Sequence, residues 1–380
     1  MNLADMLCYA DIQQLSSIAS TYDCKCNGHS KNELIQSILS KVNRKDVFER
    51  EVGALSTEHI RFLNSIVFDS RDLFSLEELI ARARQSNFGP AGEERNPRDM
   101  ISSFKHRGWL FNGYSHTTKY LFQFPHDLKK RFMETMGRTL GQNLMYADTP
   151  AVYRDEQKLI VDDIANVLHY IYHHEVVLTS DGSIYKRHLL QLLDRLAVKE
   201  EPVPKGGWRF GYGRKYRDLP NRLSLIYDYC YYHDLIAEQP GLLVLTDKGT
   251  NNVLGGKRED LSQVYRFWLK LYKGPIPNLH SLVYWIGKLA TDWVSAGSLG
   301  SALCPLIRPF YYDSSDSIFD QRILQMMMHL GLIRIGEDEE AGKTVAFTKL
   351  GVSIVSGTYL ADEEAIPMTV PDEFDNPVFP

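Results

Sequence analysis

Residues 242–256 read LLVLTDKGTNNVLGG, and a near copy, AFTKLGVSIVSG, stands at residues 346–357. In each stretch an apolar, strand-like run leads into a threonine, and a glycine follows three positions later. Thr246 and Thr348 stand where a helix N-cap belongs. Gly249 and Gly351 would let the next helix lie close to the preceding ribbon. The shared T-x-x-G therefore predicts a joint between a β ribbon and a helix that occurs twice in the chain.

A phosphate-binding loop is the alternative interpretation of the stretch GTNNVLGGKRED. Its spacing does not fit a P-loop, because Gly249 and Gly256 are seven positions apart rather than five. Lys257 is followed by Arg258, so no hydroxyl is supplied for a magnesium ion. The chain contains no other Walker motif, and the sequence predicts neither a nucleotide motor nor a bound cofactor.

The composition limits the class of protein. With 380 residues, of which 44% are hydrophobic and 24% charged, the chain resembles a soluble globular protein of several domains. No apolar run approaches the roughly 20 residues of a membrane helix, so no membrane partner is expected. The scattered cysteines indicate reduced thiols and a cytoplasmic location. Because the net charge is −5, any contact with nucleic acid depends on local basic patches.

One order of elements, three helices followed by a two-stranded ribbon, recurs along the chain and is the order of a winged helix. We expect winged-helix-like units at residues 52–145, 156–257 and 258–358. A small SAP-like helix-loop-helix unit at 1–48 precedes them, and an acidic, proline-containing tail or linker at 359–380 follows. The predicted fold class is mainly α with small β ribbons, arranged as tandem winged-helix-like units.

Three local signals mark helix starts in the first part of the chain. Ser30 with Glu33, and Ser75 with Glu78, have the spacing of capping boxes. Asn96 is followed by a proline, which predicts an N-cap and a first helical position that needs no N–H. These signals predict helices that begin near residues 31, 76 and 97.

Residues 205–217, KGGWRFGYGRKYR, combine five basic side chains, four aromatic rings and four glycines. Basic side chains neutralise phosphates, aromatic rings stack on unpaired bases, and glycine lets the backbone follow a strand. The stretch is therefore a candidate nucleic-acid site. The alternative is an interhelical loop whose rings pack on the domain and whose arginines face water. The candidate residues are Lys205, Trp208, Arg209, Tyr212, Arg214, Lys215 and Arg217.

The third helix of each winged-helix-like unit would be the recognition helix on duplex DNA. In the first unit this helix offers Arg98, Lys105 and Arg107, which we take as candidate DNA-binding residues. In the third unit it offers only Arg322 and His329, so we expect that helix to form core or to face a protein. Protein contact by such units is the alternative for the whole chain, because a fold does not fix a function.

Two groups have some features of metal sites. His169 and His173 share a helical face, but neither an HExxH order nor a third ligand accompanies them. Cys24, Cys26 and His29 are spaced too tightly for a usual zinc site and lack a fourth partner. We expect no metal, and the absence of a nucleophile motif gives no reason to expect catalysis.

The run DDIANVLHYIYHHEVVLTSDGSIYKRHLLQLLDRL at 162–196, followed by LIAEQPGLLVLTDKG at 235–249 and LGLIRIGEDEEAGKTVAFTKLG at 330–351, carries a family likeness. It resembles the N-terminal accessory region of XPB-type DNA helicases, most of all the bacterial proteins, over roughly residues 50–357. The resemblance implies an intracellular, helicase-associated module of DNA repair or transcription that positions a motor or a partner on DNA. The chain has no P-loop and no DExH-like box, so helicase activity is not carried over, and it looks like a stand-alone or truncated form without the motor.

Together these features predict a non-catalytic, DNA-associated adaptor. Its expected partners are duplex or single-stranded DNA, a protein such as a helicase or another DNA-processing factor, or both. The alternative is a protein-interaction scaffold or regulator with no direct contact to nucleic acid. The order of elements predicts the architecture, whereas the charges of the first unit and of residues 205–217 carry the functional prediction.

Overall fold

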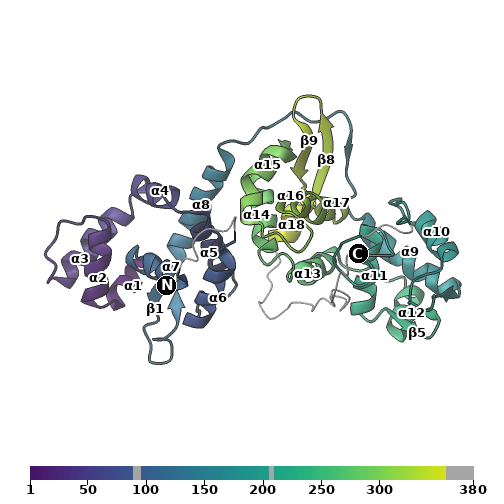
Figure 1. The fold of residues 1–380 in the computed structure, drawn as a ribbon, viewed down its shortest axis with the longest axis horizontal. Helices are drawn as coiled ribbons and strands as arrows, with labels where there is room; N and C mark the ends of the chain where they lie inside the picture. The colour runs from purple at the N-terminus through teal and green to yellow at the C-terminus, as the bar shows by residue number, and fades with distance from the viewer. Residues whose placement is uncertain (89–95, 205–208, 357–380) are drawn as a thin grey trace, which may run out of the picture. The chain divides into compact units, whose positions relative to one another are not determined.

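The structure, a computed structural model, describes residues 1–88, 96–204 and 209–356. It divides into two compact units, unit 1 at Met1–Leu144 and unit 2 at Met145–Pro380, which are described separately (Figure 1). Both consist mainly of helices with small antiparallel sheets, as the sequence predicts for the fold class. Residues Lys205 and Trp208 of the candidate site and the tail at 359–380 lie outside the described residues.

Unit 1 is a bundle of helices packed around an aromatic core. The rings of Phe62 and Phe104 stack with centroids 5.4 Å apart, and Trp109 lies 6.0 Å from Phe104 and 5.2 Å from Phe48. Phe48 belongs to the N-terminal helices, so these helices share one core with the rest of the unit. The helices are α1 (Leu3–Tyr9), α2 (Ile12–Thr21), α3 (Lys31–Val42), α4 (Lys45–Gly53), α5 (Thr57–Val67), α6 (Leu76–Ser86), α7 (Pro97–His106) and α8 (His126–Gly141).

The ribbon of unit 1 joins two short strands, β1 (Phe111–Asn112) and β2 (Phe122–Gln123), in antiparallel register. Phe74, which lies between α5 and α6, forms an isolated bridge to Phe122 at the other edge of β2. The order in this part of unit 1 is therefore helix, short extended segment, two helices and a hairpin. The loop of the hairpin projects from the lower side of unit 1 in Figure 1.

The predicted helix starts agree with the observed caps, with one difference. The capping box of Ser75 and Glu78 forms in both directions, and the Asn96 side chain accepts a hydrogen bond from the Arg98 N–H. Ser30 accepts from the Glu33 N–H at 3.4 Å, but the Glu33 carboxylate accepts from the N–H of Asn27 instead of returning to Ser30. Only half of that predicted box is formed, because the preceding loop supplies a competing donor.

The first half of unit 2 contains a three-stranded sheet whose order is β4-β6-β5. Its hairpin is formed by β5 and β6, and β4 adds to the free edge of β6 through Val176 and Val177. The order again is helix, short strand, two helices and a hairpin, followed by one more helix. The elements are α9 (Leu159–His173), β4 (Val176–Val177), α10 (Lys186–Arg195), α11 (Asn221–Tyr232), β5 (Ile236–Gln239), β6 (Leu242–Leu245) and α12 (Asp247–Leu254).

The second half of unit 2 repeats this order with a four-stranded sheet, β3-β8-β9-β7. The long hairpin of β8 and β9 is its centre, and the short strands β3 and β7 add to the two outer edges. A π-helical segment at Ile318–Leu324 connects α16 to α17. The elements are β3 (Tyr153–Arg154), α13 (Leu261–Tyr272), α14 (Leu279–Leu289), β7 (Val294–Ser295), α15 (Ala296–Leu303), α16 (Ser315–Ser317), α17 (Gln325–His329), β8 (Ile333–Asp338), β9 (Gly342–Phe347) and α18 (Lys349–Ser356).

The two T-x-x-G joints have the geometry that the sequence predicts. Thr246 caps α12 by accepting from the Gly249 N–H at 3.0 Å, and Thr348 caps α18 by accepting from the Gly351 N–H at 2.8 Å. A Cβ atom at Gly249 would overlap the carbonyl oxygen of Leu235, where the preceding helix turns into β5. Each glycine thus permits a close approach of the new helix to the chain that enters the hairpin.

A buried network of charges connects the two halves of unit 2. Arg222 on α11 is fully buried and pairs with Asp163 on α9 at 2.5 Å and with Glu156 at 3.2 Å. Glu156 in turn accepts a hydrogen bond from His329 of α17 at 3.0 Å. His329 is therefore internal, in line with the expectation that its helix forms core or faces a protein, and the network joins segments that are up to 173 residues apart in the sequence.

Candidate nucleic-acid interface

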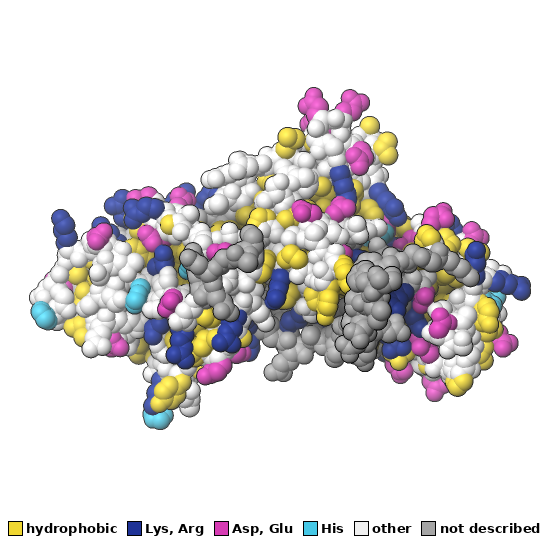
Figure 2. All heavy atoms as spheres, in the orientation of Figure 1, with side chains coloured by type: hydrophobic (Ala, Val, Ile, Leu, Met, Phe, Trp, Pro, Cys, Tyr) yellow, Lys and Arg dark blue, Asp and Glu magenta, His cyan; other side chains and the backbone are white. Residues whose placement is uncertain are grey.

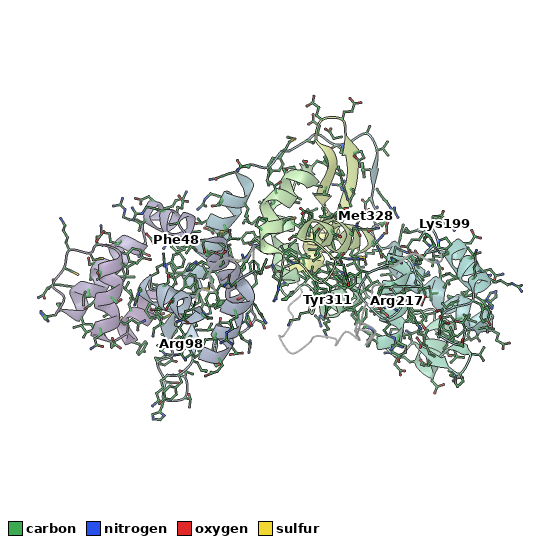
Figure 3. The ribbon with its side chains drawn as sticks, in the orientation of Figure 1. Phe48, Arg98, Lys199, Arg217, Tyr311 and Met328 are labelled. Carbon is green, nitrogen blue, oxygen red and sulfur yellow. The ribbon has the colours of Figure 1, made fainter. Side chains whose placement is uncertain are left out.

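Helix α7 presents two of the predicted basic residues to solvent. Arg98 lies in the first turn and is exposed, and it has no acidic partner among the residues that the structure describes. Lys105, two turns later, is half-buried, with its Nζ atom 5.6 Å from the centre of the Phe122 ring. This contact supports the stem of Lys105 on the ribbon and leaves its charge at the surface. In the view of Figure 3, Arg98 lies on the side of unit 1 from which the β1–β2 loop projects.

Arg107 differs from its two neighbours, because its guanidinium is held against the body of unit 1. It hydrogen-bonds the Ser103 hydroxyl and lies 3.5 Å from the carboxylate of Glu51 on α4. The charge of Arg107 is thus neutralised internally. Its role is to attach the end of α7 to the N-terminal helices rather than to extend the exposed basic face.

The β1–β2 loop adds exposed cationic and aromatic side chains that were not among the predicted site residues. Lys119 and Tyr120 are exposed at its end, with the Lys119 Nζ atom 4.9 Å from the Tyr120 ring centre. Tyr114 is also exposed and stacks on the exposed ring of Tyr9 at 4.9 Å. The loop is ordered by its own hydrogen bonds, among them Gly113 N–H to Leu121 O at 2.9 Å. The signal in the sequence is the segment YSHTTKY, which interleaves aromatic and basic residues.

Together, α7 and the β1–β2 loop form a surface that we call the α7 face, defined by Arg98, Lys105, Lys119 and Tyr120. Figure 2 shows dark-blue side chains gathered on unit 1 above the loop. Cations next to exposed aromatic rings can neutralise phosphates and contact sugar or base edges. The α7 face therefore has the chemistry of a nucleic-acid contact, and its residues on the helix and in the loop lie 14 or more positions apart in the sequence.

The described part of the second candidate site, residues 209–217, is largely tied to unit 2. Arg209 donates to the backbone oxygen of Leu219 at 2.7 Å and to the side-chain oxygen of Asn221. Burial lowers the pKa of the Arg209 guanidinium, and the nearby Arg322 lowers it further. The charge of Arg209 consequently fixes the loop to the start of α11.

Glu238 on β5 forms ion pairs with the next two cations of this loop. Arg214 pairs with it at 3.3 Å and lies over the Tyr231 ring, 3.8 Å from its centre. Lys215 is also close to Glu238, at 3.5 Å, and donates to the backbone oxygen of Gly182 at 2.7 Å. Both side chains therefore have protein partners in the positions where the candidate site would need free charge.

The remaining described candidates of this loop differ in exposure. Tyr212 is buried, its ring lies 5.1 Å from the Arg322 guanidinium, and burial raises the pKa of its hydroxyl. Arg217 is exposed and donates to the Tyr216 hydroxyl at 3.3 Å. Of the described residues 209–217, Arg217 is thus the cation that stands most clearly at the surface.

A buried carboxyl group explains why the loop turns sharply here. The backbone N–H of Arg214 donates to Asp228 on α11 at 3.1 Å, and Gly213, at φ +103°, brings the loop backbone directly against that carboxyl. Any side chain at residue 213 would overlap Asp228. Asp228 is fully buried, and burial raises the pKa of its carboxyl to about 7, against the weaker opposing effect of the Arg214 N–H.

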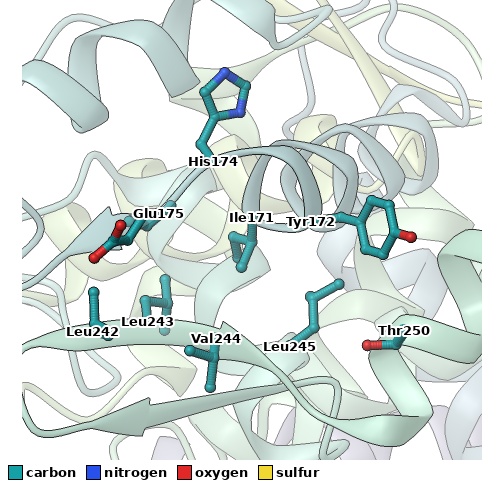
Figure 4. Close-up of a pocket in the computed structure, with 10 residues that line it drawn as sticks. Ile171, Tyr172, His174, Glu175, Leu242, Leu243, Val244, Leu245 and Thr250 are labelled. Carbon is teal, nitrogen blue, oxygen red and sulfur yellow. The ribbon is translucent and has the colours of Figure 1, made fainter.

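A shallow cavity of about 230 Å³ lies between the end of α9 and strand β6 (Figure 4). Apolar side chains such as Ile171 and Leu243 form much of its wall. Figure 4 shows the His174 ring turned away from the strand, with Glu175 at the left of the view and Tyr172 at the right. His174 Nδ1 hydrogen-bonds the Tyr170 carbonyl oxygen at 2.9 Å. A catalytic site requires polar groups that converge on one point, and the polar groups of this cavity do not converge.

The described residues contain no group of three or more His, Cys, Asp or Glu side chains arranged to hold a metal ion. His169 and His173 do share a face of α9, with ring centres 6.4 Å apart. Cys24 and Cys26 are free thiols, as are the other three cysteines. Residues 1–88, 96–204 and 209–356 include no helix that is both long and apolar enough to cross a membrane.

Comparison with known proteins gives no match: no protein-family model, no curated protein and no solved structure is similar to this chain. The resemblance to the accessory region of XPB-type helicases therefore stays a prediction from the sequence.

Proposed function

We propose that this chain is a non-catalytic DNA-binding adaptor that contacts duplex DNA through the α7 face of unit 1. The observation that carries the proposal is that Arg98 and Lys105 on α7 and Lys119 in the β1–β2 loop keep their charges at the surface, whereas Arg209, Arg214 and Lys215 have protein partners. A protein with a net charge of −5 needs such a local basic surface to approach phosphates.

The proposal takes the recurring elements as winged-helix-like units, with α7 as recognition helix and the β1–β2 hairpin as wing. Support comes from the shared order of helix, short strand or extended segment, two helices and hairpin in all three parts of the chain. A helix such as α7 fits the major groove, and a hairpin beside it reaches the flanking backbone. Arg98 in the first turn of α7 is then placed to reach base edges or phosphates, while Lys105 and Lys119 neutralise phosphates.

The helicase-accessory function implied by the sequence resemblance fits this proposal. An adaptor of this kind would hold a motor or another DNA-processing factor at a DNA site and would not itself hydrolyse ATP. The tip of the β8–β9 hairpin suits a protein contact better than DNA, since Glu337, Asp338, Glu339 and Glu340 stand there. Like charges at that tip would repel a phosphate backbone.

The test is fluorescence anisotropy of a labelled 20-base-pair duplex titrated with the full chain at low salt. We expect the variant Arg98→Ala/Lys105→Ala/Lys119→Ala to bind about 10-fold or more weakly, because three phosphate contacts are removed. The matched control removes three exposed cations of unit 2 and changes the net charge equally. That control variant is Lys186→Ala/Arg187→Ala/Arg266→Ala.

Equal weakening by the two triple variants would show a general charge effect and would reject the α7 face as the site. Absence of duplex binding by the unaltered chain at low salt would reject DNA binding and favour the protein-interaction scaffold. A scaffold would retain its protein partner after nuclease treatment, whereas a complex bridged by DNA would lose it.

A further inference from the structure

A tight turn in unit 2 presents two tyrosines in a conformation that tyrosine rarely adopts. The turn is closed by two backbone hydrogen bonds between Phe310 and Asp313, each 3.0 Å long. Its two central residues are Tyr311 and Tyr312, and Tyr311 has φ +49°. Turns of this shape normally place glycine at the first central position, because an L side chain is strained at positive φ.

Strain of this kind points to a requirement for the side chain itself. A non-glycine residue at positive φ is held there by its surroundings, and such residues concentrate at functional sites. Tyr311 is 64% exposed and Tyr312 62%, so neither ring stabilises the core enough to explain its position. The turn instead holds two large rings at the surface.

The turn is fixed from below by a buried ion pair. The carboxylate of Asp313 accepts from Arg322 Nε at 2.9 Å, and both residues are buried. Arg322 also donates to the backbone oxygen of Phe210 at 2.7 Å, which attaches the 209–217 loop to the same point. The two tyrosines therefore stand on a rigid base, and their rings lose little freedom when a ligand binds.

Aromatic rings contact the turn, and an exposed arginine precedes it in the sequence. The Phe310 ring meets Tyr311 edge-on at 4.7 Å, and the Phe210 ring centre lies 6.2 Å from that of Tyr311. Arg308, two residues before Phe310, is exposed and has no ion pair within the described residues. The one carboxylate of the turn, Asp313, is already paired with Arg322. Figure 3 labels Tyr311 and Arg217, both in unit 2.

We propose that the Tyr311 turn, defined by Arg308, Phe310, Tyr311 and Tyr312, is a stacking site for single-stranded nucleic acid. Exposed bases stack on the two tyrosine rings, and Arg308 neutralises a phosphate of the same strand. An exposed cation two residues before Phe310, with the turn's own carboxylate neutralised, favours a polyanion over a neutral peptide.

This inference rests on the proposed function for the class of ligand, but it uses none of the residues of the α7 face. A duplex contact in unit 1 and a single-strand contact in unit 2 would let one chain bind where duplex and single strand meet. The two contacts are tested separately, because each has its own variants and its own oligonucleotide.

The experiment measures anisotropy of a labelled 15-nucleotide oligothymidine with the full chain at low salt. The first variant is Tyr311→Gly, which removes the ring and relieves the positive-φ strain, so its melting temperature should stay equal or rise. The second is Tyr312→Ser, at a position whose φ is not positive. The control is Tyr185→Ala, which removes another exposed tyrosine of unit 2.

We expect both turn variants to weaken binding of the oligothymidine about 10-fold or more, with Tyr185→Ala unchanged. The triple variant of the α7 face should keep most single-strand binding. The proposal is overturned if Tyr311→Gly binds as tightly as the unaltered chain, or if the unaltered chain does not bind the oligothymidine. It is also overturned if a proline-rich peptide binds this turn and the oligonucleotide does not.

Discussion

Replacing Asp228 by asparagine tests how the 209–217 loop is anchored. The carboxyl of Asp228 is fully buried, and its pKa is raised from 3.8 to about 7. A difference of about three pKa units corresponds to about 4 kcal/mol of folding free energy, since each unit is worth 1.36 kcal/mol. Asparagine keeps the oxygen that accepts from the Arg214 N–H at 3.1 Å. The variant Asp228→Asn removes the charge and retains the shape.

The sign of the effect follows from the direction of the pKa shift. Below about pH 4 the carboxyl is protonated in both the folded and the unfolded chain, so its charge does not affect stability. Between about pH 4 and pH 7 it ionises only in the unfolded chain, and the folded state loses stability progressively. Above pH 7 the full loss, about 4 kcal/mol, remains. We therefore expect Asp228→Asn to be more stable than the unaltered chain at pH 8, with little difference at pH 4.

Urea unfolding followed by tryptophan fluorescence measures this difference at pH 4, 6 and 8. Trp268, Trp285 and Trp293 are buried in unit 2, which contains Asp228, while Trp109 in the core of unit 1 adds a contribution that Asp228→Asn should leave unchanged. The control Asp194→Asn changes the charge of a side chain that is 91% exposed, and it should shift stability by less than about 0.5 kcal/mol. A difference between Asp228→Asn and the unaltered chain that does not grow from pH 4 to pH 8 would refute the buried-charge explanation.

Three further substitutions probe the fold and the loop. Gly249→Ala should destabilise unit 2 by about 2 kcal/mol or more, because its Cβ would overlap the backbone before β5. The control Gly53→Ala places its Cβ in open space and should be neutral or stabilising. Thermal unfolding compares the two variants. Arg222→Met should destabilise by about 3 kcal/mol in urea unfolding, because it leaves Asp163 buried without its cation. Arg214→Ala should lower the melting temperature without changing duplex affinity in the anisotropy assay, since its guanidinium is engaged within unit 2. Unchanged stability of Gly249→Ala or Arg222→Met, or a loss of duplex affinity in Arg214→Ala, would contradict these expectations.

Local signals in the sequence predicted the parts of the fold that depend on neighbouring residues. The joint at Thr246 and Gly249 and the capping box of Ser75 and Glu78 each involve atoms three residues apart, so the spacing alone defines the hydrogen bonds. The helical spacing of His169 and His173 placed both on one face of α9 for the same reason. The short strands β3 and β7 were missed, because two residues leave no periodic pattern, and pairing with a distant hairpin defines them.

The candidate site was predictable only in part. The helical pattern was enough to place Arg98 and Lys105 on α7, but Arg107 finds its partner, Glu51, in a segment 56 residues earlier. The same holds for Arg214, whose partner Glu238 lies on a strand 24 residues later. Composition shows that cations are present, whereas their availability depends on which carboxylates the fold brings near them.

The most direct test of the proposed function is the salt dependence of duplex binding. Plotting the logarithm of the binding constant against that of the salt concentration should give a line whose slope reports the number of neutralised phosphates, about 0.9 per contact. The variant Arg98→Ala/Lys105→Ala/Lys119→Ala should flatten this slope by about two to three, and the matched unit 2 variant should leave it unchanged. Equal slopes for the unaltered chain and the α7-face variant would contradict DNA binding through this surface.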